Sequence, residues 1–258
     1  MRVHGIVFTA VLLLIVLVPA RNAAAVTLQD AKNVFNGYQE NIGNLKTSIE
    51  LFDQVIRDTP APGIVYQAYW MESRAYATMG DHPVRTRTNP LDDYEAGKRC
   101  AARAIQVNPD GEKGYFWYAV NLGKAGHLQG VLHALFMLPE FFKYMDRAYQ
   151  LDPHDPWVLV AYGALYYHLP WFVGGNNDKA LGYFRQALAA DPNFTVAMVF
   201  IGRIYIREDR HKEARQVLEK VVHYTTPASK ADWSMSDVPA AQKLLESIRE
   251  TNDAPAKQ

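Results

Sequence analysis

The stretch TVAMVFIGRIYIREDRHKEARQVLEKVVHYTTP, residues 195–227, shows most clearly the pattern from which the fold can be predicted. The small residue Gly202 is followed by the aromatic Tyr205, and small or apolar residues recur at Ala214, Leu218 and Val221. A small side chain lets a neighbouring helix approach closely, and an aromatic side chain one turn later fills the gap that remains. The stretch therefore predicts two closely packed helices that end before a proline.

The same form recurs along the chain. Five segments run from an apolar or small residue to a proline five positions later: VIRDTP (55–60), AIQVNP (104–109), AYQLDP (148–153), ALAADP (187–192) and VHYTTP (222–227). This spacing resembles the tetratricopeptide repeat, in which about 34 residues form two antiparallel helices. The first four prolines stand 39 to 49 residues apart, so the repeats carry insertions. Tandem pairs bury their faces only against neighbours, and three or more are needed for stability.

We therefore predict an all-α, tetratricopeptide-repeat-like α-solenoid of about five antiparallel helix pairs with loop insertions. The repeats are expected over residues 26–225. A linker and a C-terminal capping helix are expected over 226–250, because Pro239 suits a first turn and Ala241, Leu244 and Ile248 share one helical face. Residues 251–258 are expected to form a disordered tail.

The N-terminal residues 1–25 have the features of a signal peptide. Arg2 precedes an apolar stretch, and the uncharged residues between His4 and Arg21 would reach only about 24 Å as a helix, short of the roughly 30 Å of a bilayer core. Ala23-Ala24-Ala25 suits cleavage before Val26. We expect a periplasmic or otherwise exported protein. An uncleaved, membrane-anchoring N-terminal helix is the alternative, and only then would the chain contact a membrane.

Composition and motifs argue against nucleic-acid binding, metal binding and catalysis. The formal net charge is +0, which argues against nucleic acid as a partner, since phosphates attract a surplus of cations. No metal site or cofactor is predicted, because none of the eight histidines belongs to an H-E-x-x-H motif. There is no G-x-S-x-G, and Cys100 stands among alanines, where a thiol is usually a small buried residue. We expect no catalytic residues and no enzyme activity.

The glycine pair Gly174-Gly175 poses a choice between a phosphate-binding loop and a loop that joins two helices. A phosphate loop would need a following lysine with serine or threonine, or G-x-G-x-x-G after a strand, and neither occurs. We interpret the pair as the end of a loop within one repeat, with Asn177 or Asp178 as the N-cap of the next helix.

Two apolar insertions, FMLPEFF (136–142) and HLPWF (168–172), are both expected between a first and a second helix, on one rim of the solenoid. One interpretation is that their side chains cover the ends of the helix pairs. The other is a docking patch for a partner or ligand, since contiguous exposed apolar surface often marks an interaction site. The rim residues are Leu138, Phe141, Leu169, Trp171 and Phe172.

The concave groove is the second candidate binding surface. The repeat register assigns nine residues to its lining: Trp70, Arg74, Lys113, Phe116, Lys124, Trp157, Tyr167, Arg203 and Arg207. Alternating rings and cations suit an extended peptide or an amphipathic acid. Alternatively, superhelical curvature buries the rings and the cations are merely solvated.

The segment LPWFVGGNNDKALGYFRQALAADP (169–192), together with YFWYAVNLGKAG (115–126), resembles the T-component family of tripartite ATP-independent transporters. The resemblance covers roughly residues 60–225. It implies a periplasmic solenoid that self-associates, docks a solute-binding protein and presents an apolar channel to a hydrophobic solute. Some members are lipoproteins, whereas this chain has no lipidation cysteine.

More distantly, the "WYA" helix and the second helices ending in "DP" resemble the regulators of microtubule dynamics. We rank this resemblance second, because the glycine pair and the export signal fit it less well. The expected function is a non-enzymatic exported scaffold that docks a solute-binding protein and contacts a hydrophobic or organic-acid solute. One alternative is a general protein-interaction or assembly factor tethered near the membrane. Another is an enzyme or carrier for a hydrophobic molecule held in a pocket between helices.

Overall fold

The structure of the chain is a computed structural model that describes residues 25–253. The predicted signal peptide therefore lies outside the described residues except for its last residue. α13 (Val238–Asp253) remains helical beyond position 251, where the sequence predicted a disordered tail to begin, and the rest of that tail lies outside the described residues.

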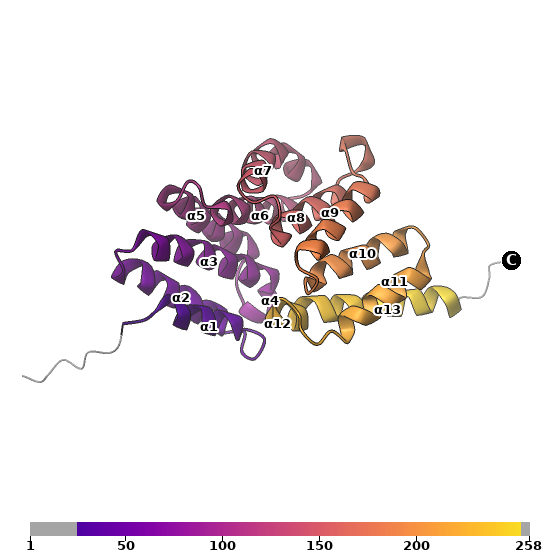
Figure 1. Ribbon diagram of the computed structural model, residues 1–258, viewed down its shortest axis with the longest axis horizontal. Helices are drawn as coiled ribbons and strands as arrows, with labels where there is room; N and C mark the ends of the chain where they lie inside the picture. Colours follow the sequence, from indigo (N-terminus) through magenta and orange to yellow (C-terminus); the bar gives the residue numbers. More distant parts are fainter. Residues whose placement is uncertain (1–24, 254–258) are drawn as a thin grey trace, which may run out of the picture.

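Every regular element between residues 25 and 253 is helical, and the long helices follow one another as pairs (Figure 1). The five pairs are α1 (Leu28–Asn36) with α2 (Asn44–Asp58), α3 (Pro62–Asp81) with α5 (Pro90–Val107), α6 (Glu112–Leu128) with α7 (Val131–Leu151), α8 (Pro156–His168) with α9 (Asn177–Ala190), and α10 (Thr195–Arg207) with α11 (His211–Val222). Each recurring proline follows a second helix. The prediction of an all-α solenoid of helix pairs is confirmed.

Shorter elements connect these pairs. They are α4 (Pro83–Thr86), the 3-10 turn η1 (Trp171–Val173), α12 (Lys230–Asp232) and the π-helical segment η2 (Trp233–Asp237), which continues into α13. On α13, Ala241 and Ile248 are buried in one cluster with Leu218 and Val221 of α11. The predicted capping helix is therefore present, and it covers the last repeat.

Helix starts follow from local sequence. Thr27 and Asp30 form a capping box at α1, in which the Thr27 hydroxyl accepts a hydrogen bond from the Asp30 amide. The carboxylate of Asp155 accepts hydrogen bonds from the amides of Trp157 and Val158 at the start of α8. These caps satisfy amides that have no partner within the helix. Helix pairs therefore begin at positions fixed by the sequence.

Two glycines allow the close helix packing that the sequence predicted. A Cβ atom at Gly163 would lie 2.5 Å from the Phe184 ring, and one at Gly202 would lie 2.6 Å from Leu218. Both distances are shorter than van der Waals contact, so only glycine permits the observed separation of first and second helix. This part of the repeat interpretation is confirmed.

The segment 136–142 does not form the loop that we expected. It lies inside α7, which is a continuous helix of 21 residues containing Pro139. Leu135, Leu138 and Phe142 keep helical spacing across the proline, which removes one backbone hydrogen bond without ending the helix. The expectation of two equivalent rim loops is therefore wrong for the first of them.

The glycine pair does end a loop between α8 and α9. Gly174 has a φ of +102°, which favours glycine. A Cβ atom at Gly175 would lie 1.8 Å from the carbonyl oxygen of Leu169. The N-cap of α9 is Asn176, whose side chain accepts from the Lys179 amide, one position before the predicted Asn177 or Asp178.

The C-terminal segment crosses back to the first repeats. In Figure 1, α12 lies beside α4 and α1, although these elements come from opposite ends of the chain. Ala231 is buried in the same apolar cluster as Phe35 and Phe52, with Met235 packed against that cluster. Residues 226–237, predicted as a plain linker, thus join the N-terminal and C-terminal halves.

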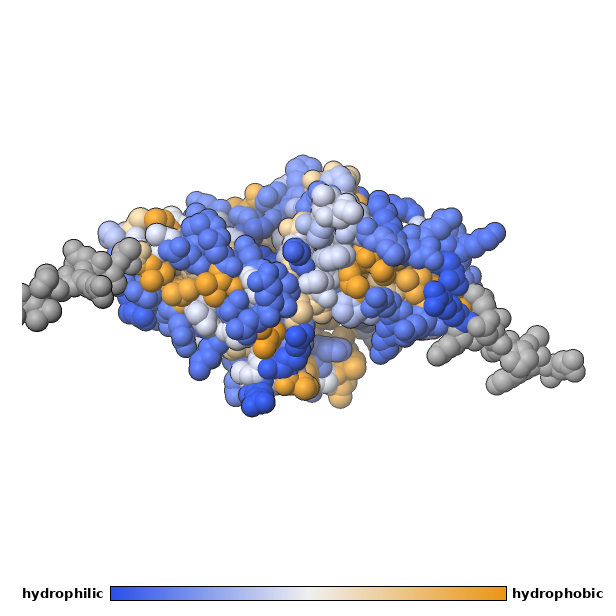
Figure 2. Space-filling view, turned by 90° about the horizontal axis from the view of Figure 1, so that it is seen from below, coloured by the Kyte–Doolittle hydropathy of each residue, from blue (hydrophilic) through white to orange (hydrophobic). Residues whose placement is uncertain are grey.

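The junction between the halves is looser than the rest of the stack. α7 packs mainly on α6 and makes few contacts with α8. Seen from below, the surface is mostly polar, with apolar side chains gathered in separate patches (Figure 2). In residues 25–253, no helix combines the length and apolar character needed to cross a bilayer.

Candidate functional site

The incomplete contact between α7 and α8 opens a central cavity of about 960 Å³. Its walls come from α3, α6 and α7 on one side and from α8, the start of α10 and residues 228–237 on the other. Most lining side chains are apolar, including Phe116, Trp157, Leu165 and Leu135. A volume in this range and an apolar lining with a few polar groups are typical of ligand pockets.

Four of the nine predicted groove residues meet at this cavity. They are Arg74, Phe116, Lys124 and Trp157. The other five lie elsewhere, so the predicted residues do not form one continuous lining of alternating rings and cations. Residues 228–237 of the C-terminal segment also line the cavity, which the repeat register alone could not reveal.

Arg74 is held by ion pairing and by ring stacking. Its Nη2 lies 2.6 Å from Oδ2 of Asp232, and the two side chains are only 15% and 23% exposed. The guanidinium carbon also lies 5.0 Å from the ring centroids of Phe35 and Trp157. A guanidinium over aromatic faces is attracted by the ring quadrupole. Arg74 is therefore part of the connection between the halves, and it is not a freely solvated cation.

Lys124 is likewise paired. Its Nζ lies 2.6 Å from Oδ1 of Asp81, and the Tyr94 hydroxyl donates to the same carboxylate at 2.9 Å. Burial, followed by the charge of Asp81, raises the pKa of Tyr94. This tyrosine therefore stays protonated at neutral pH and acts as a hydrogen-bond donor.

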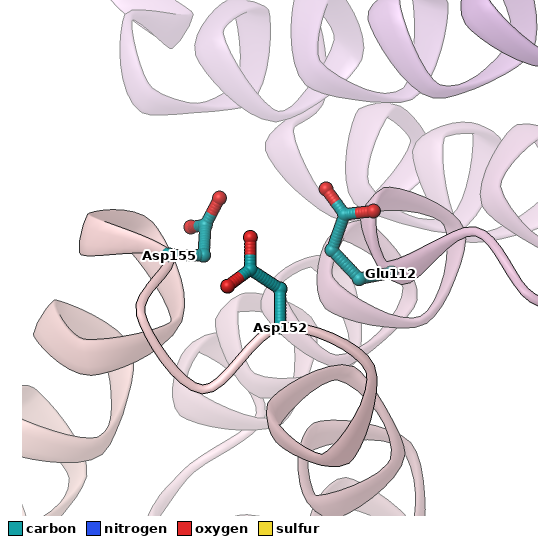
Figure 3. A group of neighbouring side chains, drawn as sticks. All are labelled: Glu112, Asp152 and Asp155. Atoms are coloured by element: carbon teal, nitrogen blue, oxygen red, sulfur yellow. The ribbon is translucent and has the colours of Figure 1, made fainter.

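Lys113 belongs to a different group, outside the cavity. The carboxylates of Glu112, Asp152 and Asp155 point toward one another from the start of α6 and the turn after α7 (Figure 3). Their nearest oxygens lie within 4.8 Å of one another. Lys113 forms an ion pair with Asp155 and lies 3.4 Å from Glu112, so a cation from the chain itself already compensates these charges. The group is explained by helix capping and ion pairing.

Tyr167 and Arg207 meet at a second, smaller pocket of about 570 Å³ beside the glycine loop. The Arg207 guanidinium carbon lies 3.9 Å from the Tyr167 ring centroid, and Nη1 donates to the Tyr167 carbonyl oxygen at 3.1 Å. Arg203 stacks on Phe200 at 5.5 Å. Trp70 packs against the apolar clusters of the first repeats. Tyr167 with Arg207, and Trp70 with its clusters, join neighbouring helices, whereas Arg203 and Phe200 lie on the same helix, α10.

The predicted rim residues divide between the cavity wall and the exposed surface. Leu138 and Phe141 line the cavity from α7, and Leu169 lines both pockets. Trp171 is 85% exposed, and Phe172 next to it is also exposed. The interpretation that all five cover helix ends therefore fails for these two aromatic residues.

Four exposed apolar residues at the α6–α7 turn are not among the predicted rim residues, although Phe136 lies in the predicted insertion 136–142. They are Leu128, Val131, Leu132 and Phe136, and Phe136 is 84% exposed. Leu128 and Val131 also line the cavity. The signal is the apolar run VLHALFML (131–138), which forms the first turns of α7 and overlaps the predicted insertion only from Phe136.

The polar residues contributed by the C-terminal segment could not be assigned from the sequence. Ser229, Asp232, Ser236 and Asp237 line the cavity, together with Asp191 and Thr195 from the start of the last repeat. They approach the cavity only because residues 228–237 fold back across the concave face. No local motif indicates such a long-range contact.

Comparison with known proteins gives two family matches. The model for "Regulator of microtubule dynamics protein 1-3" matches residues 27–172, and a model for the tetratricopeptide repeat matches residues 174–231. Regulator of microtubule dynamics protein 1 of Homo sapiens is 28% identical over 175 residues, covering 62% of this chain and 54% of the relative. Regulator of microtubule dynamics protein 3 of Rattus norvegicus is 24% identical over 208 residues, covering 74% and 42% respectively.

The chain thus spans about half the length of the curated relatives that it matches. Among solved structures, a thermophilic tetratricopeptide-repeat protein of Thermus thermophilus superposes with a TM-score of 0.58 at 14% identity, covering 82% of this chain and 99% of that one. This likeness supports the fold alone. The family matches favour the resemblance that we ranked second, and none of the relatives named here is a transport component.

Proposed function

The chain belongs to the family of regulators of microtubule dynamics, proteins 1-3, and we propose that it is a non-enzymatic scaffold that binds an apolar segment of a partner protein in the central cavity. The tetratricopeptide-like fold supports protein interaction as the general role. The observation that carries the specific proposal is the apolar cavity of about 960 Å³ between the two halves.

The surface beside the cavity suits a polypeptide. Leu128 and Val131 line the cavity, and Leu132 and Phe136 extend the same exposed apolar surface along the first turns of α7. Exposed apolar surface of this kind usually marks an interaction site. A helix or extended segment laid in a groove is a recurring mode of peptide recognition, with apolar side chains as anchors.

The charged groups of the cavity favour binding over catalysis. Arg74 is paired with Asp232, and Lys124 is paired with Asp81. Cations held in such pairs serve the structure and are poorly placed to activate a substrate. An enzyme or carrier for a hydrophobic molecule, the alternative from another class, would need titratable groups that converge on one reacting atom.

Photo-crosslinking with a filled-cavity variant tests the proposal. A benzoylphenylalanine residue in place of Leu165, which lines the cavity, is expected to crosslink to a partner protein in the cells that make the chain. Mass spectrometry of the crosslinked peptide should identify an apolar segment. Ala164→Trp fills the cavity and should abolish the crosslink, whereas Ala189→Trp, on the exposed face of α9, should not.

The proposal fails if Ala164→Trp leaves the crosslink unchanged although the variant is folded by circular dichroism. It also fails if benzoylphenylalanine at Ala189 captures the same segment equally well, because that would show contact without use of the cavity. In both cases the cavity would not be the binding surface.

A role at microtubules is a second candidate, and the family match over residues 27–172 favours it. The expected outcome is a change in the rate or plateau of tubulin polymerisation, measured by turbidity, on addition of the chain. Ala164→Trp and Ala189→Trp would then show whether the effect uses the cavity. Unchanged turbidity would remove this candidate.

Docking to an exported solute-binding protein is a third, finer hypothesis. It is supported by the segment LPWFVGGNNDKA, residues 169–180, whose Trp171 and Phe172 are exposed. Co-purification from a periplasmic extract, with mass spectrometry of bound proteins and small molecules, tests the hypothesis and would also report self-association. Absence of any transport component would end it.

A further inference from the structure

One end of the central cavity is acidic. Asp237 is the last residue of η2, and its side chain is 6% exposed and lines the cavity. Its Oδ2 accepts a hydrogen bond of 2.6 Å from the hydroxyl of Thr195. Asp191, four residues before Thr195, lines the same cavity. We call Asp191, Thr195 and Asp237 the acidic end.

The charges around the cavity do not balance. The aspartates in its wall are Asp81, Asp191, Asp232 and Asp237, whereas the lysine and arginine side chains are Arg74 and Lys124. Both cations are already paired, with Asp232 and Asp81 respectively. Within residues 25–253, neither Asp191 nor Asp237 forms an ion pair, so two carboxylates remain without a cation.

Asp237 is also in an unusual setting. Burial raises the pKa of its carboxyl group to about 7. An uncompensated charge in an apolar site is costly, and a bound cation would relieve that cost. In addition, Asp237 lies in a π-helical segment, a geometry that is rare and frequently occurs at functional sites.

The acidic end lies at one end of α8, and the exposed apolar residues lie at the other. Phe194, between Asp191 and Thr195, packs edge-on against Trp157 at the start of α8, with ring centroids 4.7 Å apart. His168 ends α8, about 17 Å further along at 1.5 Å per residue. His127 and Leu128, at the end of α6, line the same cavity as His168, so the α6–α7 turn bounds the cavity together with this second end of α8.

We propose that the acidic end receives a positively charged side chain of the bound segment, so that the partner carries a lysine or arginine at one end of an apolar stretch. This inference rests on the proposed function and specifies the chemistry of its partner. The apolar stretch would extend from the acidic end toward Leu128 and the first turns of α7. A charge-assisted pair with Asp237 would fix its direction in the cavity.

Three peptides of matched length test the inference. Each has one apolar body, an acetylated N-terminus and an amidated C-terminus, and they differ only in a terminal lysine, glutamine or glutamate. Binding to the full chain is measured at pH 8 by fluorescence anisotropy. The lysine peptide should bind about tenfold more tightly than the glutamine peptide, as expected for a hydrogen bond to a charged group. The glutamate peptide should bind least tightly.

Single substitutions of aspartate by asparagine test the charge of the acidic end while they preserve the shape of the side chain. Asp237→Asn keeps an oxygen that accepts from Thr195 and removes the charge, so it should bring the affinity for the lysine peptide down to that for the glutamine peptide. Asp191→Asn should reduce the preference without altering the Thr195 contact. Asp58→Asn, at the exposed end of α2, is the matched control and should change neither.

The outcomes distinguish a failure of the charge inference from a failure of the proposed binding in the cavity. If the three peptides bind equally, or if the glutamate peptide binds most tightly, the charge inference is overturned while the cavity remains a binding site. If Asp237→Asn is folded and retains the lysine preference, the acidic end is not the recognition point. If none of the peptides binds and Ala164→Trp has no effect on crosslinking, the proposed function fails together with the inference.

Discussion

Tyr38 and Asp232 stand 194 residues apart in the chain, yet the tyrosine hydroxyl donates a hydrogen bond of 2.7 Å to the carboxylate of Asp232. The same carboxylate accepts from Arg74 through its other oxygen. One aspartate from the C-terminal segment therefore connects the first two repeats to the last part of the fold.

Asp232→Asn should weaken this connection. The substitution removes the charge that compensates Arg74, and leaving a partly buried guanidinium without a partner costs free energy. We expect the free energy of unfolding, measured in urea, to fall by about 1–3 kcal/mol. Glu50→Gln, on the exposed face of α2, is the control and should stay within about 0.5 kcal/mol of the wild type. Equal effects of the two substitutions would show that Asp232 does not hold the halves together.

Gly163→Ala should destabilise the chain, whereas Gly182→Ala should not. A methyl group at Gly163 would lie 2.5 Å from the Phe184 ring, while one at Gly182 would meet nothing within 4 Å. We expect a loss of about 1–3 kcal/mol at Gly163 from overpacking. A gain of about 0.5–1 kcal/mol is expected at Gly182, inside α9, from helix propensity. Thermal unfolding of both variants measures the difference, and a stable Gly163→Ala would show that α8 and α9 can separate without cost.

Glu72 should make stability depend on pH. Its side chain is 4% exposed, and burial raises the pKa of its carboxyl group to about 7, with Asp53 adding to the rise and a hydrogen bond from Cys100 opposing it. The unfolded chain loses this proton near pH 4.5, but the folded chain keeps it until about pH 7. The free energy of unfolding should therefore fall as the pH rises from 4.5 to 7, because the unfolded state binds fewer protons in that window.

Glu72→Gln removes this contribution. At pH 8 the variant should be more stable than the wild type by up to about 3 kcal/mol, while below pH 4.5 the two should be similar. Asp237, whose pKa is also raised to about 7 by burial, contributes a fall of the same sign, so part of the pH dependence should remain. Urea unfolding at a series of pH values measures the free energy of unfolding of the wild type and of the variant. A variant with the same pH profile as the wild type would contradict the assignment.

If the predicted signal peptide is cleaved on export, the mature protein should have a single defined N-terminal residue. When the full chain is expressed in a bacterial host, intact-mass analysis of the protein from the periplasmic fraction should show a chain that begins at Val26. A protein that retains Met1 and remains with the membrane fraction would instead favour the uncleaved anchor. Substitution of Ala25 by a bulky residue should block cleavage in the first case and change nothing in the second.

The helix pairs could be predicted because their signals are local. Glycines such as Gly163 and Gly202, and a proline after each second helix, occur at corresponding places within the repeats and act on immediate neighbours. The segment FMLPEFF (136–142) was predicted as an insertion between two helices, although its apolar residues keep helical spacing across Pro139 inside α7. Local sequence therefore predicts the repeats. It does not predict α7, where a proline and a helical pattern of apolar residues occur together.

The candidate site depended on contacts that no local pattern encodes. Arg74, Phe116, Lys124 and Trp157 were assigned to the concave face by repeat register, and they do line the cavity. Their partner Asp232 comes from a segment that carries no repeat signal. For the same reason Asp237 could not be recognised as a cavity residue before the return of residues 228–237 was known.

The return of the C-terminal segment to α1 and α3 also limits how the chain can vary in length. An open array of repeats tolerates the addition or loss of one unit, because each unit touches only its neighbours. Here an added helix pair would shift Asp232 relative to Tyr38 and Arg74 and would break both hydrogen bonds. The contact between the two ends therefore fixes the number of repeats, because only one number of helix pairs brings Asp232 within hydrogen-bonding distance of Tyr38 and Arg74.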